Sequence, residues 1–142
     1  MRHILTGVLA TIAIVSLTAA ASAQQKNFTA TLGGGFEVPA VAGAGKGKAT
    51  VTLDPASKTI IYEVEYSGLS GPATAAHIHG PAAPGANAGV AVPLGPPASP
   101  IKGTKTLTDA QIADLEAGKD YVNVHTDANK GGEIRGQLTP AK

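Results

Sequence analysis

Short runs of alternating apolar and polar residues, ended by glycine or proline, dominate this sequence. The chain has 142 residues, of which 18 are glycine and 10 are proline. Alternation with a period of two is typical of strands that bury one face, and frequent turn residues keep such strands short. The clearest case is the pair of runs at 48–53 and 60–66, joined by a turn at 54–57, which predicts a β-hairpin. The chain is therefore expected to be all-β.

The remaining strands can be placed by the same pattern, with one helix among them. Strands are predicted at 27–32, 75–79, 89–93, 103–107, 121–126 and 133–138. Thr108 and Gln111 have the spacing of a capping box, and Gly118 suits a left-handed helix stop. This predicts a short crossover helix at about 109–117. About 7–8 short strands with turns between them indicate a Greek-key β-sandwich.

The N-terminus has the pattern of an export signal. Arg2 precedes an apolar run from residue 4 to about residue 21, and Ala21, Ser22 and Ala23 fit a small-residue cleavage site. We therefore expect residues 1–23 to be a signal peptide, cleaved after about Ala23. Residues 24–142 would form a single domain, secreted or periplasmic, with no transmembrane segment in the mature chain.

Charge and composition argue against nucleic acid as a partner. Without Arg2 the chain carries ten basic and ten acidic residues, and no cluster of basic residues appears. Aromatic residues make up 4% of the chain. A nucleic-acid-binding domain needs a concentrated basic surface, and single-strand binding needs aromatic stacking platforms.

Three histidines stand out as candidate metal ligands. His77 and His79 lie in one predicted strand and His125 in another, and no other histidine occurs after the predicted signal peptide. Alternate residues of a strand share a face, so His77 and His79 form a pair of imidazoles on one side. If His125 faced the same side, the three rings would form a facial set with an open position. The alternative is that they are ordinary surface histidines.

The last hairpin can be registered from its apolar residues. Pairing Val124 with Ile134 keeps Val122 and Val124 on the core face, whereas a slip by one residue would expose both. Glu133 would then lie opposite His125, as a fourth ligand or as a partner that orients an imidazole. Arg135 would balance charge or attract an anionic substrate. The polar face shared with His125 is expected to carry Tyr121, Asn123, Glu133 and Arg135.

The ligand set favours copper, with zinc as the second choice. The chain contains no cysteine, and its one methionine is Met1. Imidazole ligands suit Cu(II) and Zn(II), and the divalent affinity order favours copper. The hypothesis is an extracytoplasmic copper-binding domain that serves buffering, delivery or redox chemistry. The alternative is an extracellular module that binds a protein or polymer, or has a structural role, without a metal.

Several motifs together resemble a known family. They are the residues Phe36-Glu37-Val38-Pro39-Ala40, Leu53-Asp54-Pro55, Ala76-His77-Ile78-His79-Gly80-Pro81, Tyr121-Val122-Asn123-Val124-His125-Thr126 and Gly132-Glu133-Ile134-Arg135-Gly136-Gln137-Leu138. Across about residues 27–139 the chain resembles the CHRD (chordin-type) domain. The resemblance implies a secreted β-sandwich, found alone in bacteria and as repeats in chordin. The histidine arrangement also looks like the copper half of copper–zinc superoxide dismutase, although the zinc-loop histidines and cysteine pair of that enzyme are absent.

Overall fold

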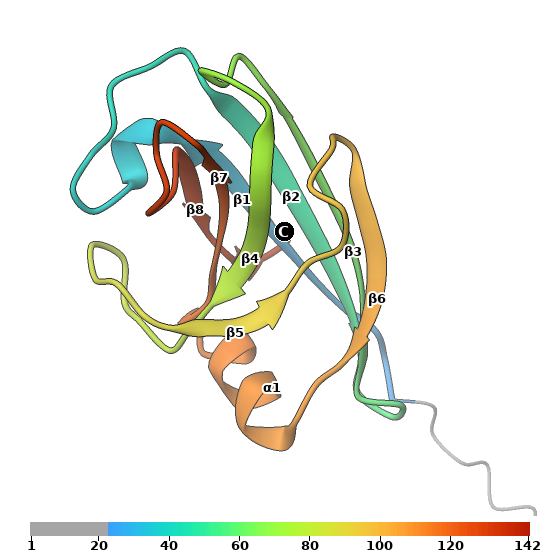
Figure 1. Cartoon of the computed structure of the whole chain (residues 1–142). Coiled ribbons are helices and arrows are strands. Elements are labelled where there is room, and N and C mark those ends of the chain that lie inside the picture. The colour runs from blue at the N-terminus through green and yellow to red at the C-terminus, as the bar shows by residue number, and fades with distance from the viewer. Residues whose placement is uncertain (1–22) are drawn as a thin grey trace, which may run out of the picture.

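The computed structural model describes residues 23–142, which form an antiparallel β-structure with one α-helix (Figure 1). The predicted signal peptide lies outside the described residues, apart from Ala23. The strands are β1 (Lys26–Gly33), β2 (Lys46–Asp54), β3 (Thr59–Ser67), β4 (Ala73–His79), β5 (Val90–Pro93), β6 (Ile101–Thr106), β7 (Tyr121–Thr126), β8 (Ile134–Gln137) and β9 (Thr139–Pro140). The helices are η1 (Gly34–Phe36), a 3₁₀ turn, and α1 (Asp109–Glu116).

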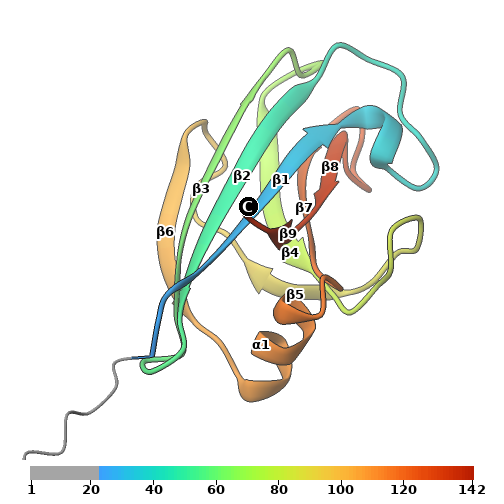
Figure 2. The same cartoon turned by 180° about the vertical axis from the view of Figure 1, so that it is seen from behind.

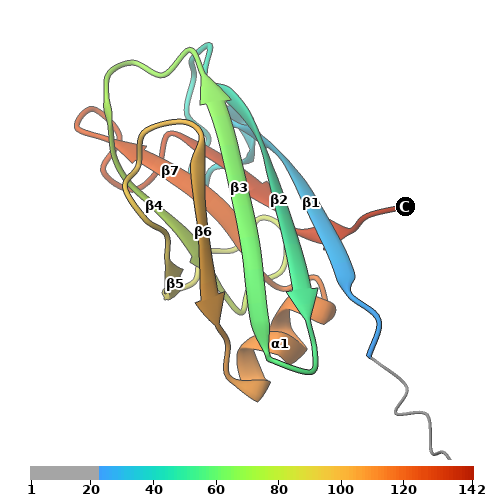
Figure 3. The same cartoon turned by 90° about the vertical axis from the view of Figure 1, so that its right-hand side faces the viewer.

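The strands form one continuous sheet that folds over itself into two layers. Its order is β5-β4-β7-β8-β1-β2-β3-β6, and β9 pairs with β1. The sheet bends from one layer to the other between β8 and β1. These two strands pair at a single position, Gly33 with Arg135. Seen from the side, the layer of β1, β2, β3 and β6 lies in front of the layer that contains β4 and β7 (Figure 3). The predicted all-β sandwich is confirmed.

Both predicted hairpins are present, and the second has the predicted register. In the first, Val51 pairs with Tyr62 and Leu53 with Ile60, so that their apolar side chains face the core. In the second, Val124 pairs with Ile134, Asn123 with Arg135 and Tyr121 with Gln137. This is the register predicted from the need to bury Val122 and Val124, both of which are fully buried.

Helix α1 closes one end of the sandwich (Figure 2). The Thr108 side chain accepts from the Gln111 backbone N–H, and the Gln111 side chain accepts from the Thr108 N–H, which confirms the capping box. Gly118 follows with φ +69°, as a left-handed stop requires. Leu115 is buried and anchors the helix to the core. The sequence pattern did not predict η1 or β9, which are only three and two residues long.

The core lies between the two layers and is built by the alternating apolar positions of both. Its members include Phe28, Leu32, Val51, Leu53, Ile60, Val64, Ile78, Ile101, Val122, Val124 and Ile134. Strand β7 differs from the others because all six of its residues are buried, including those that face away from this core. Its second face must therefore be covered, and the candidate site lies there. Among residues 23–142, no helix has the length and apolar character needed to cross a membrane.

Candidate metal centre

The three histidines converge on the covered face of β4 and β7. His77 and His79 come from β4, and His125 comes from the neighbouring strand β7. Each offers one ring nitrogen to a group whose members all lie within 4.8 Å of one another. The shortest separation is 3.0 Å, between His77 Nδ1 and His125 Nε2. The predicted convergence of the three rings is thus present.

Backbone carbonyls fix the proton positions of two of the rings. His79 Nδ1 lies 2.9 Å from the Ala88 carbonyl oxygen, and His125 Nδ1 lies 2.9 Å from the Lys130 carbonyl oxygen. A carbonyl oxygen can only accept, so both Nδ1 atoms carry the proton. In the neutral rings each Nε2 therefore has a lone pair, which in His125 accepts from His77 Nδ1. A metal-bound histidine usually donates its second ring N–H in this way.

The lone pair of His79 has no partner among the described residues. His79 is 9% exposed, and its Nε2 is buried and accepts no hydrogen bond. A buried polar atom without a partner costs free energy, so its presence calls for an explanation. A cation bound by the three rings would provide one, since it would accept this lone pair.

The electrostatic setting favours the neutral forms of His77 and His79. Burial lowers the pKa of His77, and the neighbouring His125 and His79 lower it further. Burial is also the main cause that lowers the pKa of His79. Both shifts favour the neutral imidazole, which is the form that binds metals.

The spacing fits a metal ion after a small closing movement. Two nitrogens that each lie ~2.1 Å from one ion can be at most ~4.2 Å apart. The separation of 3.0 Å between His77 Nδ1 and His125 Nε2 is within that limit, whereas the widest separation of 4.8 Å must shorten. Rotation of the side chains can supply this movement. Binding through His77 Nδ1, which now donates to His125, requires the other neutral tautomer, with the proton on His77 Nε2.

Tyr121 and Arg135 stack in turn on one face of the His79 ring. The ring of Tyr121 lies parallel to that of His79, with 5.0 Å between centroids, and the guanidinium carbon of Arg135 lies 3.4 Å from the Tyr121 ring centre. The Tyr121 hydroxyl accepts from the Ala88 N–H at 3.1 Å. Tyr121 and Arg135 thus hold both the ring of His79 and the loop that carries its carbonyl partner.

Glu133 is not part of the group of close ligand atoms, and in this arrangement it contacts the histidines neither as a fourth ligand nor as the partner that orients an imidazole. Its carboxylate accepts hydrogen bonds from the Ser70 backbone N–H and hydroxyl and from the Thr126 hydroxyl, each at 2.6 Å, and from the Asn129 amide at 3.1 Å. Burial alone would raise the pKa of Glu133, but these bonds hold it at about 2. Alternation fails at Glu133 because β8 begins at Ile134 and Gly132 turns the chain with φ +126°.

Asn123, a further predicted supporting residue, lies close to a buried carboxyl group, that of Glu37. Its amide donates to the Gly131 carbonyl at 3.3 Å, and its proximity to Glu37 lowers the pKa of that carboxyl group against the larger effect of burial. Its Oδ1 is buried without a partner. A side chain at Gly132 would collide with both Glu37 and Asn123, so the glycine allows them to approach. The sequence pattern had not marked Glu37, although it lies in one of the motifs quoted above.

The model of the CHRD domain family matches residues 28–138, which include all three histidines. The chain belongs to the CHRD domain family. No curated protein and no solved structure matches the chain. CHRD domains are typically extracellular, and the three histidines of this CHRD domain lie close enough together to hold a metal ion.

Asp120 is a buried carboxyl group at the base of the loop that follows β4. It is 4% exposed, and its Oδ1 has no hydrogen-bond partner among the described residues. Burial, with a smaller contribution from Asp114, raises its pKa to about 7. Because the folded state holds this proton more tightly than the unfolded state, stability falls as pH rises from about 4 to about 7.

We therefore expect the substitution Asp120→Asn to remove part of that pH dependence. Between pH 5 and pH 8 the variant should lose roughly 1–3 kcal/mol less unfolding free energy than the parent. Urea unfolding at the two pH values measures the difference. An identical loss in both proteins would show that Asp120 ionises freely in the folded state.

Proposed function

We propose that this CHRD domain is an extracytoplasmic copper-binding domain, with His77, His79 and His125 as its ligands. In this proposal residues 1–23 direct export and are removed after about Ala23. The observation that carries the proposal is the pair of Nδ1–carbonyl bonds, which leave the Nε2 atoms of His79 and His125 as acceptors beside His77 Nδ1. An ordinary cluster of surface histidines has no reason to be fixed in this way.

The ligand atoms follow from the proton positions. His79 and His125 would bind through Nε2, because their Nδ1 atoms donate to Ala88 and Lys130. His77 would bind through Nδ1, which already faces His125 Nε2. Three imidazoles and no thiolate or thioether suit Cu(II) better than Zn(II) at equal availability. Zinc is the second candidate for the same ligands.

The surrounding residues would hold the rings rather than react. Tyr121 stacks on His79, Arg135 stacks on Tyr121, and the carbonyls of Ala88 and Lys130 accept from the Nδ1 atoms of His79 and His125. When bound, copper would supply a redox-active centre with a position open to a further ligand. Buffering or delivery of copper requires only the three histidines, so it is the simplest form of the proposal.

Titration of metal-free mature protein with Cu(II) tests the proposal. We expect one equivalent to bind tightly, with an electron paramagnetic resonance spectrum that shows coupling to imidazole nitrogens. A triple variant with His77, His79 and His125 each changed to alanine should lose this signal. If the domain is instead an extracellular binding or structural module without a metal, Cu(II) should bind weakly and equally to both proteins.

A further inference from the structure

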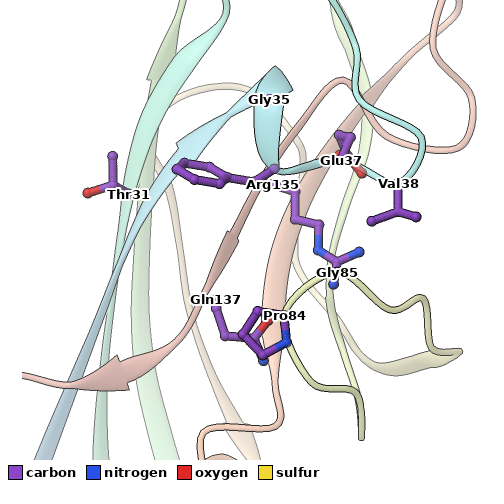
Figure 4. Close-up of a pocket in the computed structure, with 9 residues that line it drawn as sticks. Thr31, Gly35, Glu37, Val38, Pro84, Gly85, Arg135 and Gln137 are labelled. Atoms are coloured by element: carbon purple, nitrogen blue, oxygen red, sulfur yellow. The ribbon is translucent and has the colours of Figure 1, made fainter.

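A cavity lined by Arg135 lies apart from the metal-ligand candidates, since none of the three histidines lines it. Its volume is about 470 Å³, and it opens between η1 and the loop after β4 (Figure 4). It is lined by Thr31, Gly35, Phe36, Glu37, Val38, Pro84, Gly85, Arg135 and Gln137. Cavities of this size with a few polar groups are typical of sites for small molecules. We propose that it binds the carboxylate of a small organic acid that carries an apolar group.

Arg135 supplies the charge that such an acid would meet. Its side chain is 2% exposed, and no carboxylate of residues 23–142 lies within 4 Å of its guanidinium nitrogens. Two of its five N–H groups donate, to the Asn87 side chain at 3.0 Å and to the Ala86 carbonyl at 2.6 Å. A buried arginine is normally paired with an anion, and three N–H groups remain for one.

Glu37 would act as a neutral partner of the same anion. It is 7% exposed, and its Oε1 has no partner among the described residues. Burial raises its pKa to about 7, although Arg135 and Asn123 act in the opposite direction. An anion beside it would raise the pKa further, so that Glu37 would bind the ligand as a protonated hydrogen-bond donor. Arg135 and Glu37 are the ionisable residues among those that line the cavity.

The rest of the wall suits the apolar part of the acid. Phe36 is 59% exposed and Val38 is 36% exposed, which makes them two of the four large exposed apolar side chains among the described residues. Both line the cavity, together with Pro84. A ring or short alkyl chain attached to the carboxylate would cover them, and this burial would add to the affinity.

A charge series of one ligand shape tests the proposal on metal-free protein, so that its outcome is independent of the copper site. The probes are benzoate, benzamide and benzylamine, followed by the amide NMR shifts of Gly35 and Gly85. We expect benzoate to bind about ten-fold more tightly than benzamide at pH 6, and benzylamine not to bind. Benzoate binding should weaken about ten-fold from pH 6 to pH 8, as Glu37 loses its proton.

Two variants sharpen the result. Glu37→Gln should bind benzoate at pH 8 as tightly as the parent binds it at pH 6, because its side chain stays neutral. Arg135→Gln should lose the preference for benzoate over benzamide. If that variant does not fold, the ligand series and Glu37→Gln still decide. Equal affinity for the three probes, tighter binding of benzylamine, or benzoate shifts confined to residues outside the cavity would overturn the proposal.

Discussion

The substitution His125→Ala is expected to weaken Cu(II) binding by ~100-fold or more. His125 provides Nε2 from β7, and its proton position is fixed by the Lys130 carbonyl. Without it the ion would have only two imidazole ligands, His77 and His79, both from β4, and no ligand from β7. Isothermal titration of metal-free protein measures the change. We expect His77→Ala and His79→Ala to have effects of the same order.

The stability of the metal-free protein should change much less than its copper affinity. His125 makes two hydrogen bonds, so its removal should cost about 1–2 kcal/mol. Glu65→Gln is a matched control, since Glu65 is exposed on β3 and offers Cu(II) a surface carboxylate remote from the three histidines. If Glu65→Gln and His125→Ala weakened copper binding equally, binding would be nonspecific.

In contrast to His125→Ala, the substitution Glu133→Gln is expected to lower the stability of the protein strongly and to affect copper affinity much less. The Glu133 carboxylate accepts four hydrogen bonds that join the segment at Ser70 to β7 and to the turn at Asn129. A glutamine amide would place a donor where the carboxylate accepts. We expect a loss of about 2–4 kcal/mol in the free energy of unfolding, measured in urea at pH 7.

The pH dependence provides a check on this explanation. Because the pKa of folded Glu133 is about 2, below its ordinary value of 4.5, its contribution is present above about pH 4.5 and is lost as pH falls toward 2. The difference between parent and Glu133→Gln should therefore shrink over that range. The control Glu65→Gln should change stability by less than ~0.5 kcal/mol. A constant difference from pH 7 to pH 2.5 would contradict the role assigned to the carboxylate.

Alternation and local capping were enough to predict most of the fold. The register of β7 and β8 followed from burying Val122 and Val124, because a strand shifted by one residue turns both to the opposite face. Helix α1 followed from Thr108 and Gln111, which need only local geometry. The convergence of the three histidines followed from the same alternation once β4 and β7 were neighbours.

The features that the sequence did not predict correctly lie outside helices and strands. The loops that cover β7 have no periodicity, so nothing in the sequence indicated that the carbonyls of Ala88 and Lys130 would fix two histidine rings. Glu133 was placed by extending alternation past Ile134, where the ladder ends. The cavity between η1 and the loop after β4 depends on how two glycine- and proline-containing segments fold, which local sequence does not specify.

Anomalous diffraction from crystals grown with copper would locate the bound metal relative to the three histidines. We expect one strong copper peak about 2 Å from His77 Nδ1, His79 Nε2 and His125 Nε2, with the Nδ1 bonds to Ala88 and Lys130 retained. Copper held at the surface by His77 alone, or a peak away from the three rings, would contradict this expectation.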